Sequence, residues 1–286
     1  MEPAVAQSST RHDSVFDGAG GVRLHRRSWR PATPRAVLLI VHGYGEHSGR
    51  YEHLGQWFAA RGFAVHAYDQ RGHGRSGGHP CHVDRFAEFL DDLARMLVVV
   101  REEEPGRPIF LVGHSMGGLI TCSFLRERRP DVLGAILSGP ALGLVDDFPA
   151  WRKWAARVGR RIVPRLSLPS GLDSSAISRD PEVVRLYRED PLVHSTMTSS
   201  FAIELLEAVG RTCGGAADVR VPVQILHGEA DRLCPLEASR SFHAELTTAG
   251  SQLRTYPGLY HEIFNEPERE TVFADMLTWL EDRLER

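Results

Sequence analysis

Three residues of the sequence could together perform nucleophilic catalysis. Ser115 lies in the segment GHSMGG, between Gly113 and Gly117, directly after an apolar run that favours a β-strand. A serine hydroxyl is a weak nucleophile at neutral pH, so it needs a base that takes its proton and an acidic group that orients the base. Asp231 and His261 each follow a later strand-like run, and they could supply these two roles.

The spacing of these residues fits a known way of building such a site. The G-x-S-x-G pattern around Ser115 is typical of a serine held in a sharp turn between a strand and a helix, and serine, aspartate and histidine follow in the corresponding chain order. Each residue comes just after the carboxyl end of a predicted strand. In a parallel sheet these ends meet at one edge, so the three side chains can come together.

Acyl transfer also needs hydrogen-bond donors for the negative charge that develops on the carbonyl oxygen. One expected donor is the backbone N–H of Met116, at the positive end of the helix that begins there. The other is the N–H of Tyr44, in the segment HGYGEHSGRY (residues 42–51), which follows the first buried strand. We expect these two groups to form an oxyanion hole.

The elements that must position these residues alternate along the chain. Apolar residues recur at intervals of three or four in a segment that ends at Val100 and in another that ends at Leu284, which predicts a helix in each place. The strand-like runs cover residues 22–29, 35–43, 63–69, 108–114, 133–139, 221–228 and 252–258. This alternation predicts an α/β fold with a mostly parallel, doubly wound sheet. We expect the strand at 22–29 to be exposed and the first dozen residues to form a loose tail.

One stretch, from residue 141 to residue 215, interrupts the alternation with helical segments, prolines and no convincing strand. We interpret it as a helical cap that separates the two parts of the core, residues 1–140 and 216–286. Such an insertion would lie over the carboxyl ends of the strands, where open α/β sheets bind ligands.

Within this insertion, residues 151–166 (WRKWAARVGRRIVPRL) form an amphipathic pattern. The apolar residues Trp151, Trp154, Val158 and Ile162 share one helical face, with six basic residues around them. Either the apolar face covers an acyl pocket, or the helix lies on an anionic membrane surface and collects lipid substrate there.

Composition narrows the range of functions. The 286 residues are 42% hydrophobic and 25% charged, which is typical of a globular protein, and the net charge of -3 gives no reason to expect nucleic acid as a partner. The four cysteines form no C-x-x-C pair, which disfavours a zinc site or a disulfide framework and suits a reducing cytoplasm. No signal-peptide pattern and no apolar run of about 18 residues is found.

Several of these segments resemble a known family. HGYGEHSGRY, YDQRGHGRSGG (residues 68–78), GHSMGG and the surroundings of Asp231 and His261 resemble the monoacylglycerol lipase branch of the α/β-hydrolase superfamily, which includes serine aminopeptidase-type and lysophospholipase-like hydrolases. The resemblance covers Val22 to the C-terminus and is weakest in the insertion.

This resemblance implies an α/β-hydrolase fold and hydrolysis of a carboxylic ester, with monoacylglycerols as the leading substrates. It implies Ser115 as nucleophile, His261 as general base and then acid, and Asp231 as the residue that orients His261. It implies no metal ion and no organic cofactor, and it leaves the oligomeric state and the acyl-chain preference open.

Other interpretations use the same residues. A general carboxylesterase, a lysophospholipase, an amide or peptide hydrolase and an acyltransferase would all share the triad, and a non-catalytic ligand-binding protein could retain it. Haloalkane dehalogenases and epoxide hydrolases normally have aspartate at the position of Ser115. Among rival triad members, Asp69 precedes the nucleophile, His243 lies within a predicted helix, and His227 precedes the acid. We expect a cytoplasmic enzyme with peripheral membrane contact through the cap.

Overall fold

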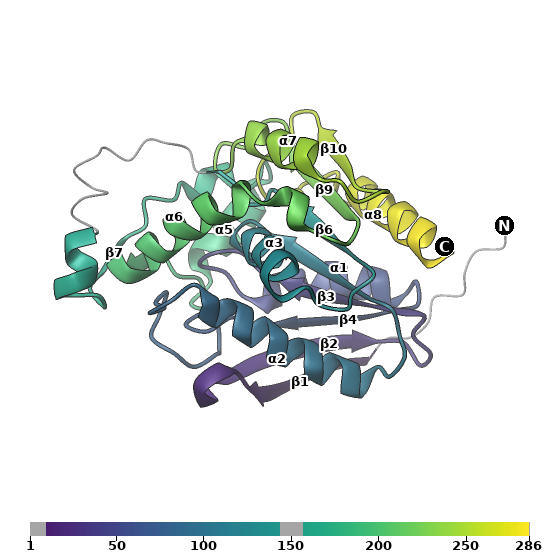
Figure 1. Ribbon diagram of the computed structural model, residues 1–286, viewed down its shortest axis with the longest axis horizontal. Coiled ribbons are helices and arrows are strands. Elements are labelled where there is room, and N and C mark those ends of the chain that lie inside the picture. Colours follow the sequence, from purple (N-terminus) through teal and green to yellow (C-terminus); the bar gives the residue numbers. More distant parts are fainter. Residues whose placement is uncertain (1–9, 144–156, 286) are drawn as a thin grey trace.

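The computed structural model describes residues 10–143 and 157–285 of the chain. Its centre is an eight-stranded sheet with the order β1-β2-β4-β3-β5-β6-β9-β10 (Figure 1). All neighbours from β4 to β10 in this order are parallel, whereas β2 is antiparallel to both β1 and β4. The strands are β1 (Thr10–Asp17), β2 (Arg23–Arg30), β3 (Ala36–Val41), β4 (Phe63–Tyr68), β5 (Ile109–His114), β6 (Gly134–Ser138), β9 (Val223–Gly228) and β10 (Gln252–Tyr256).

Helices cover both faces of this sheet. In Figure 1, α2 and α3 cross the near face, while α1 and α8 lie behind the strands. The α-helices with fully described bounds are α1 (Glu52–Ala59), α2 (Ala87–Glu103), α3 (Met116–Arg128), α5 (Pro181–Glu189), α6 (Ser199–Cys213), α7 (Leu236–Glu245) and α8 (Arg269–Leu284).

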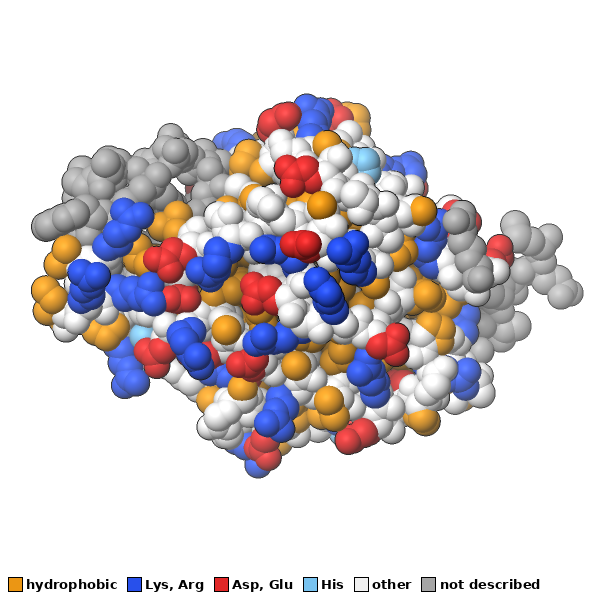
Figure 2. All heavy atoms as spheres, in the orientation of Figure 1, with side chains coloured by type: hydrophobic (Ala, Val, Ile, Leu, Met, Phe, Trp, Pro, Cys, Tyr) orange, Lys and Arg blue, Asp and Glu red, His pale blue; other side chains and the backbone are white. Residues whose placement is uncertain are grey.

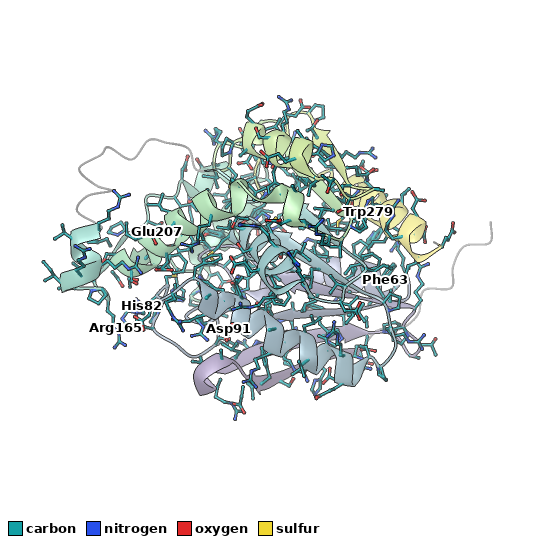
Figure 3. The ribbon with its side chains drawn as sticks, in the orientation of Figure 1. Phe63, His82, Asp91, Arg165, Glu207 and Trp279 are labelled. Atoms are coloured by element: carbon teal, nitrogen blue, oxygen red, sulfur yellow. The ribbon has the colours of Figure 1, made fainter. Side chains whose placement is uncertain are left out.

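The central strand β3 shows why the sequence folds into these layers. Its side chains alternate: Val37, Leu39 and Val41 belong to the core beneath α2 and α3. Leu38 and Ile40 belong to the opposite core, beneath α1 and α8. A strand buried on both faces has no polar side, which explains the continuous apolar run. Phe63 and Trp279, which Figure 3 labels, belong to this opposite core as well.

The structure confirms the predicted mostly parallel, doubly wound sheet, and all seven predicted strands are present. Two expectations at the N-terminal side were wrong. Residues from Thr10 onward form β1 instead of a loose tail, and β1 pairs with β2 along its whole length. The strand β2 is largely buried instead of exposed, because neighbours flank it on both sides.

The described part of the chain between β6 and β9 lies outside the eight-stranded sheet. It contains a two-stranded antiparallel sheet of β7 (Ser167–Pro169) and β8 (Thr196–Thr198), the short helix η3 (Ser174–Ala176), and α5 and α6. The expectation of no strand in this stretch was therefore wrong, because strands of three residues are too short to show an alternating pattern. Residues 157–162 are helical, whereas Trp151 and Trp154 lie outside the described residues.

Candidate active site

Ser115 occupies a strained turn between β5 and α3. Its backbone has φ 53° and ψ -118°, and residues other than glycine rarely adopt such a positive φ. The N–H of Ser115 donates to the carbonyl oxygen of Ser138 at 3.0 Å, and its own carbonyl accepts from the N–H of Ala141 at 3.0 Å. These bonds tie the turn to the end of β6 and hold the serine in its unusual conformation.

The glycines on either side of Ser115 are required by close packing. A Cβ atom at Gly113 would lie 2.5 Å from Oγ1 of Thr121, and one at Gly117 would overlap the carbonyl oxygen of Val41. The first turn of α3 therefore lies directly against β3 and β5, and a side chain at either position would push it away. The G-x-S-x-G pattern reflects this close approach.

Asp231 and His261 form a directly bonded pair. Nδ1 of His261 contacts Oδ2 of Asp231 at 2.7 Å. The other oxygen of Asp231, Oδ1, accepts the backbone N–H groups of Leu233 at 2.8 Å and Cys234 at 2.9 Å. Because those two bonds fix the carboxylate plane, Oδ2 is held toward the imidazole and selects the histidine tautomer with hydrogen on Nδ1.

The environment of this pair favours a charged histidine. Burial lowers the pKa of His261, but the charge of Asp231 and their hydrogen bond raise it by more, so that the pKa lies above its usual value. Burial likewise works against the charge of Asp231, but the charge of His261 and the bonds from its neighbours lower the pKa of that carboxyl. The pair therefore stabilises the imidazolium that a general base becomes when it takes a proton.

Ser115 lies close to this pair. The ring of the adjacent residue, His114, has its centroid 4.8 Å from that of His261. Burial, and then the charge of Asp231, raises the pKa of the nearby thiol of Cys234. Among the described residues no hydrogen bond joins Ser115 Oγ to His261. Such bonds are often long without substrate and shorten in the reacting complex.

The two expected oxyanion donors are available. Within residues 10–143 and 157–285, neither the N–H of Tyr44 nor that of Met116 donates to a protein acceptor. The loop that carries Tyr44 is fixed on both sides: the N–H of Gly43 donates to Glu46 at 2.6 Å, and the carbonyl of Gly45 accepts the N–H of His194 at 2.7 Å. A hole built from such fixed donors can stabilise charge without rearranging.

A buried network beneath the site was not predicted from the sequence. Arg50 donates to both oxygens of Glu262 at 2.7 Å and to Glu46 at 3.0 Å, and the hydroxyl of Tyr51 donates to Glu46 at 2.8 Å. Burial opposes the charge on Glu46, but the charge of Arg50, two nearby histidines and the N–H of Gly43 together lower the pKa of this carboxyl. This network connects the loop of Tyr44 with the residue that follows His261.

The rival residues take other roles. Asp69 accepts the N–H groups of Ser48 and Arg75, each at 2.8 Å, and so holds the loop after β4. His243 lies within α7. The sequence spacing did not reveal the contact that His227 makes. Its Nε2 lies 3.1 Å from Oδ2 of Asp231, so the aspartate has a second buried histidine partner.

Comparison with known proteins now identifies the family. The family described as serine aminopeptidase, S33, matches residues 32–268. The chain belongs to this family. Monoacylglycerol lipase from Mycolicibacterium smegmatis is 38% identical over 279 residues, covering 97% of this chain and 99% of the relative. Human monoglyceride lipase is 35% identical over 270 residues, covering 93% and 89%.

The solved structures agree with this family assignment. The crystal structure of Paleococcus ferrophilus monoacylglycerol lipase superposes with a TM-score of 0.82 at 34% sequence identity, covering 91% of this chain and 99% of that chain. The sequence resemblance to the monoacylglycerol lipase branch and the α/β-hydrolase fold are thus both confirmed. This S33 family member therefore has the core architecture that its sequence predicted.

Proposed function

We propose that this protein is a serine hydrolase that cleaves monoacylglycerols to fatty acid and glycerol. The observation that carries the proposal is the bonded Asp231–His261 pair beside the strained turn of Ser115. The N–H groups of Tyr44 and Met116, which have no acceptor among the described residues, add the two donors. The similarity to monoacylglycerol lipases supports this choice among carboxylic esters.

In the proposed mechanism His261 takes the proton of the Ser115 hydroxyl while Oγ attacks the ester carbonyl carbon. The N–H groups of Tyr44 and Met116 bind the resulting oxyanion. His261 then gives its proton to the glycerol oxygen as that bond breaks, which leaves an acyl-enzyme. A water molecule that His261 activates attacks the acyl carbon, and the fatty acid leaves as Ser115 regains its proton.

The decisive experiment compares wild type with Ser115→Ala. Initial rates are measured on p-nitrophenyl esters and 1-monoacylglycerols of increasing chain length, with the exposed residue Ser167 replaced by alanine as the matched control. We expect turnover to disappear only in Ser115→Ala, because no other group supplies the nucleophile. Near wild-type activity in that variant would refute the mechanism. A preference for the shortest esters, with poor turnover of monoacylglycerols, would instead identify a general carboxylesterase.

We also propose that residues 141–215 act as a cap that meets a membrane surface. The described helices include none with the length and apolarity needed to cross a bilayer. Exposed apolar side chains gather in this insertion: Ile162 is 73% and Leu166 52% exposed. Figure 2 shows basic side chains beside hydrophobic ones at this end of the molecule, where Figure 3 labels Arg165. This combination suits an anionic lipid surface.

A vesicle co-sedimentation assay tests this contact. Full-length protein is mixed with neutral vesicles and with vesicles that contain anionic lipid, and Ile162→Ser is compared with Val98→Ser, a change at an exposed valine on α2, outside the insertion. We expect binding that depends on anionic lipid and that weakens in Ile162→Ser. Equal binding to both kinds of vesicle would contradict the proposed surface.

A further inference from the structure

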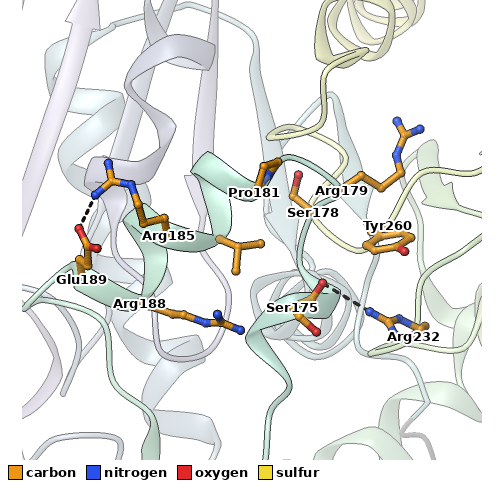
Figure 4. Close-up of a pocket in the computed structure, with 10 residues that line it drawn as sticks. Ser175, Ser178, Arg179, Pro181, Arg185, Arg188, Glu189, Arg232 and Tyr260 are labelled. Atoms are coloured by element: carbon orange, nitrogen blue, oxygen red, sulfur yellow. Dashed lines mark hydrogen bonds and ion pairs between the residues drawn. The ribbon is translucent and has the colours of Figure 1, made fainter.

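A cavity opens at the loops that carry Asp231 and His261. It has a volume of about 700 Å³ and opens between the segment of η3 and α5 on one side and the loops after β9 and β10 on the other (Figure 4). Two of its lining residues are chain neighbours of the triad, since Arg232 follows Asp231 and Tyr260 precedes His261. The cavity is therefore lined by the same two loops that carry Asp231 and His261.

Four arginines line this cavity, and two of them are already paired with carboxylates. The guanidinium of Arg185 contacts Glu182 at 2.6 Å and also contacts Glu189. Nε of Arg179 donates to Glu266 at 3.0 Å. These pairs neutralise Arg179 and Arg185, so their charges are balanced within the protein.

The other two, Arg188 and Arg232, have no carboxylate in an ion pair among the described residues. Nε of Arg188 donates to the hydroxyl of Ser174 at 2.8 Å, and Nη2 of Arg232 lies 3.4 Å from the carbonyl oxygen of Ser175. Figure 4 shows the two side chains extending toward each other from opposite sides of Ser175. The charges of both arginines also act on the carboxyl of Asp173, whose Oδ1 already accepts the N–H and the hydroxyl of Ser175.

Both guanidinium groups are held in place by neutral contacts. The guanidinium of Arg232 also lies 5.1 Å from the centre of the Tyr260 ring, which favours a cation over its face. Each group keeps N–H donors that the described residues leave unused. The two guanidinium groups contact the adjacent residues Ser174 and Ser175 and line an open cavity. Two positive charges in such a place attract an anion.

We propose that Arg188 and Arg232 bind a phosphate group in this cavity. A phosphate presents oxygens in several directions and can accept from two guanidinium groups on opposite sides, whereas a carboxylate offers two oxygens in one plane. The volume also leaves room for the glycerol to which a phosphate would be attached. The phosphate comes either from the head group of a lysophospholipid substrate or from a free phosphate compound; the substrate case rests on the proposed ester hydrolysis.

The first test measures binding without catalysis. Isothermal titration calorimetry compares glycerol 3-phosphate with glycerol on wild type, Arg188→Gln, Arg232→Gln and the double variant. Arg254→Gln on β10 is the control, because it removes the same charge from a residue that does not line the cavity. We expect each cavity variant to weaken glycerol 3-phosphate binding about ten-fold and the control to change it little. Unchanged affinity in the double variant, or no binding by the wild type, would overturn the proposal.

The second test separates the two sources of phosphate. Values of kcat/KM are measured for 1-acylglycerol and 1-acylglycerol 3-phosphate with the same acyl chain. A selective loss on the phosphorylated substrate in the cavity variants supports the head-group source. Binding of glycerol 3-phosphate without hydrolysis of the phosphorylated lipid supports the free compound. If no ester is hydrolysed by the wild type, the proposed function fails, while calorimetry still tests the phosphate site.

Discussion

Replacing Asp231 by asparagine tests the candidate triad with the least change of shape. In the Asp231→Asn variant the amide oxygen would remain where Oδ1 is now, because the N–H groups of Leu233 and Cys234 require an acceptor there. That orientation turns the NH₂ group toward Nδ1 of His261. A donor at this position favours the tautomer with hydrogen on Nε2, which cannot accept a proton from Ser115.

The size of the effect follows from this change of tautomer. The serine keeps its position and the oxyanion donors stay in place, so only the base is lost. We expect kcat to fall by about 10⁴-fold, equivalent to about 5 kcal/mol of transition-state stabilisation. The thermal midpoint should change little, because the two backbone bonds to position 231 persist.

Steady-state hydrolysis of a p-nitrophenyl ester measures this loss directly. The matched control is Asp275→Asn. This change removes a carboxylate on α8 that pairs with Arg254 of β10 at 2.8 Å. The control should retain wild-type kcat. Activity of the Asp231→Asn variant within ten-fold of wild type, in a correctly folded protein, would refute the assignment of Asp231 as the orienting acid.

Three further predictions concern the same region. The acid limb of the kcat/KM profile should lie above pH 6.5, because Asp231 raises the pKa of His261 and the base acts only when neutral; a midpoint below pH 6.5 would contradict this. Gly117→Ala should lower the free energy of unfolding by about 1–3 kcal/mol, measured in urea, because its Cβ overlaps the backbone of β3. An unchanged midpoint would show that α3 can shift. Glu46→Ala should lower the free energy of unfolding by about 3 kcal/mol and reduce kcat, because it removes the acceptor of the Gly43 N–H and one of the two carboxylates that pair with Arg50. Glu237→Ala, at an exposed site, should change neither quantity.

The sequence predicts the central sheet well because its strands are apolar on both faces. The edge strand β1 shows the limit of this reasoning. Its side chains are mostly exposed, and backbone hydrogen bonds to β2 hold it in the sheet, so no hydrophobic pattern indicates it. The pair β7 and β8 is likewise too short for periodicity to reveal.

The candidate site divides in a similar way. Ser115, Asp231 and His261 could be selected because each follows a recognisable strand, and the structure brings the latter two into contact. The spacing of Glu46 and Arg50 suits an i,i+4 ion pair, but the third member, Glu262, is far away in the chain. Only the folded arrangement shows that this charge network joins the loop of Tyr44 to the residue after His261.

The position of β9 and β10 at one edge of the sheet has a consequence for biosynthesis. The turn of Ser115 depends on β5 and β6, whereas Asp231 and His261 follow strands that the ribosome makes last. A nascent chain can therefore form the turn of Ser115 but not the Asp231–His261 pair until these two strands dock. For the same reason, local unfolding of this edge would stop hydrolysis while the central strands remained folded.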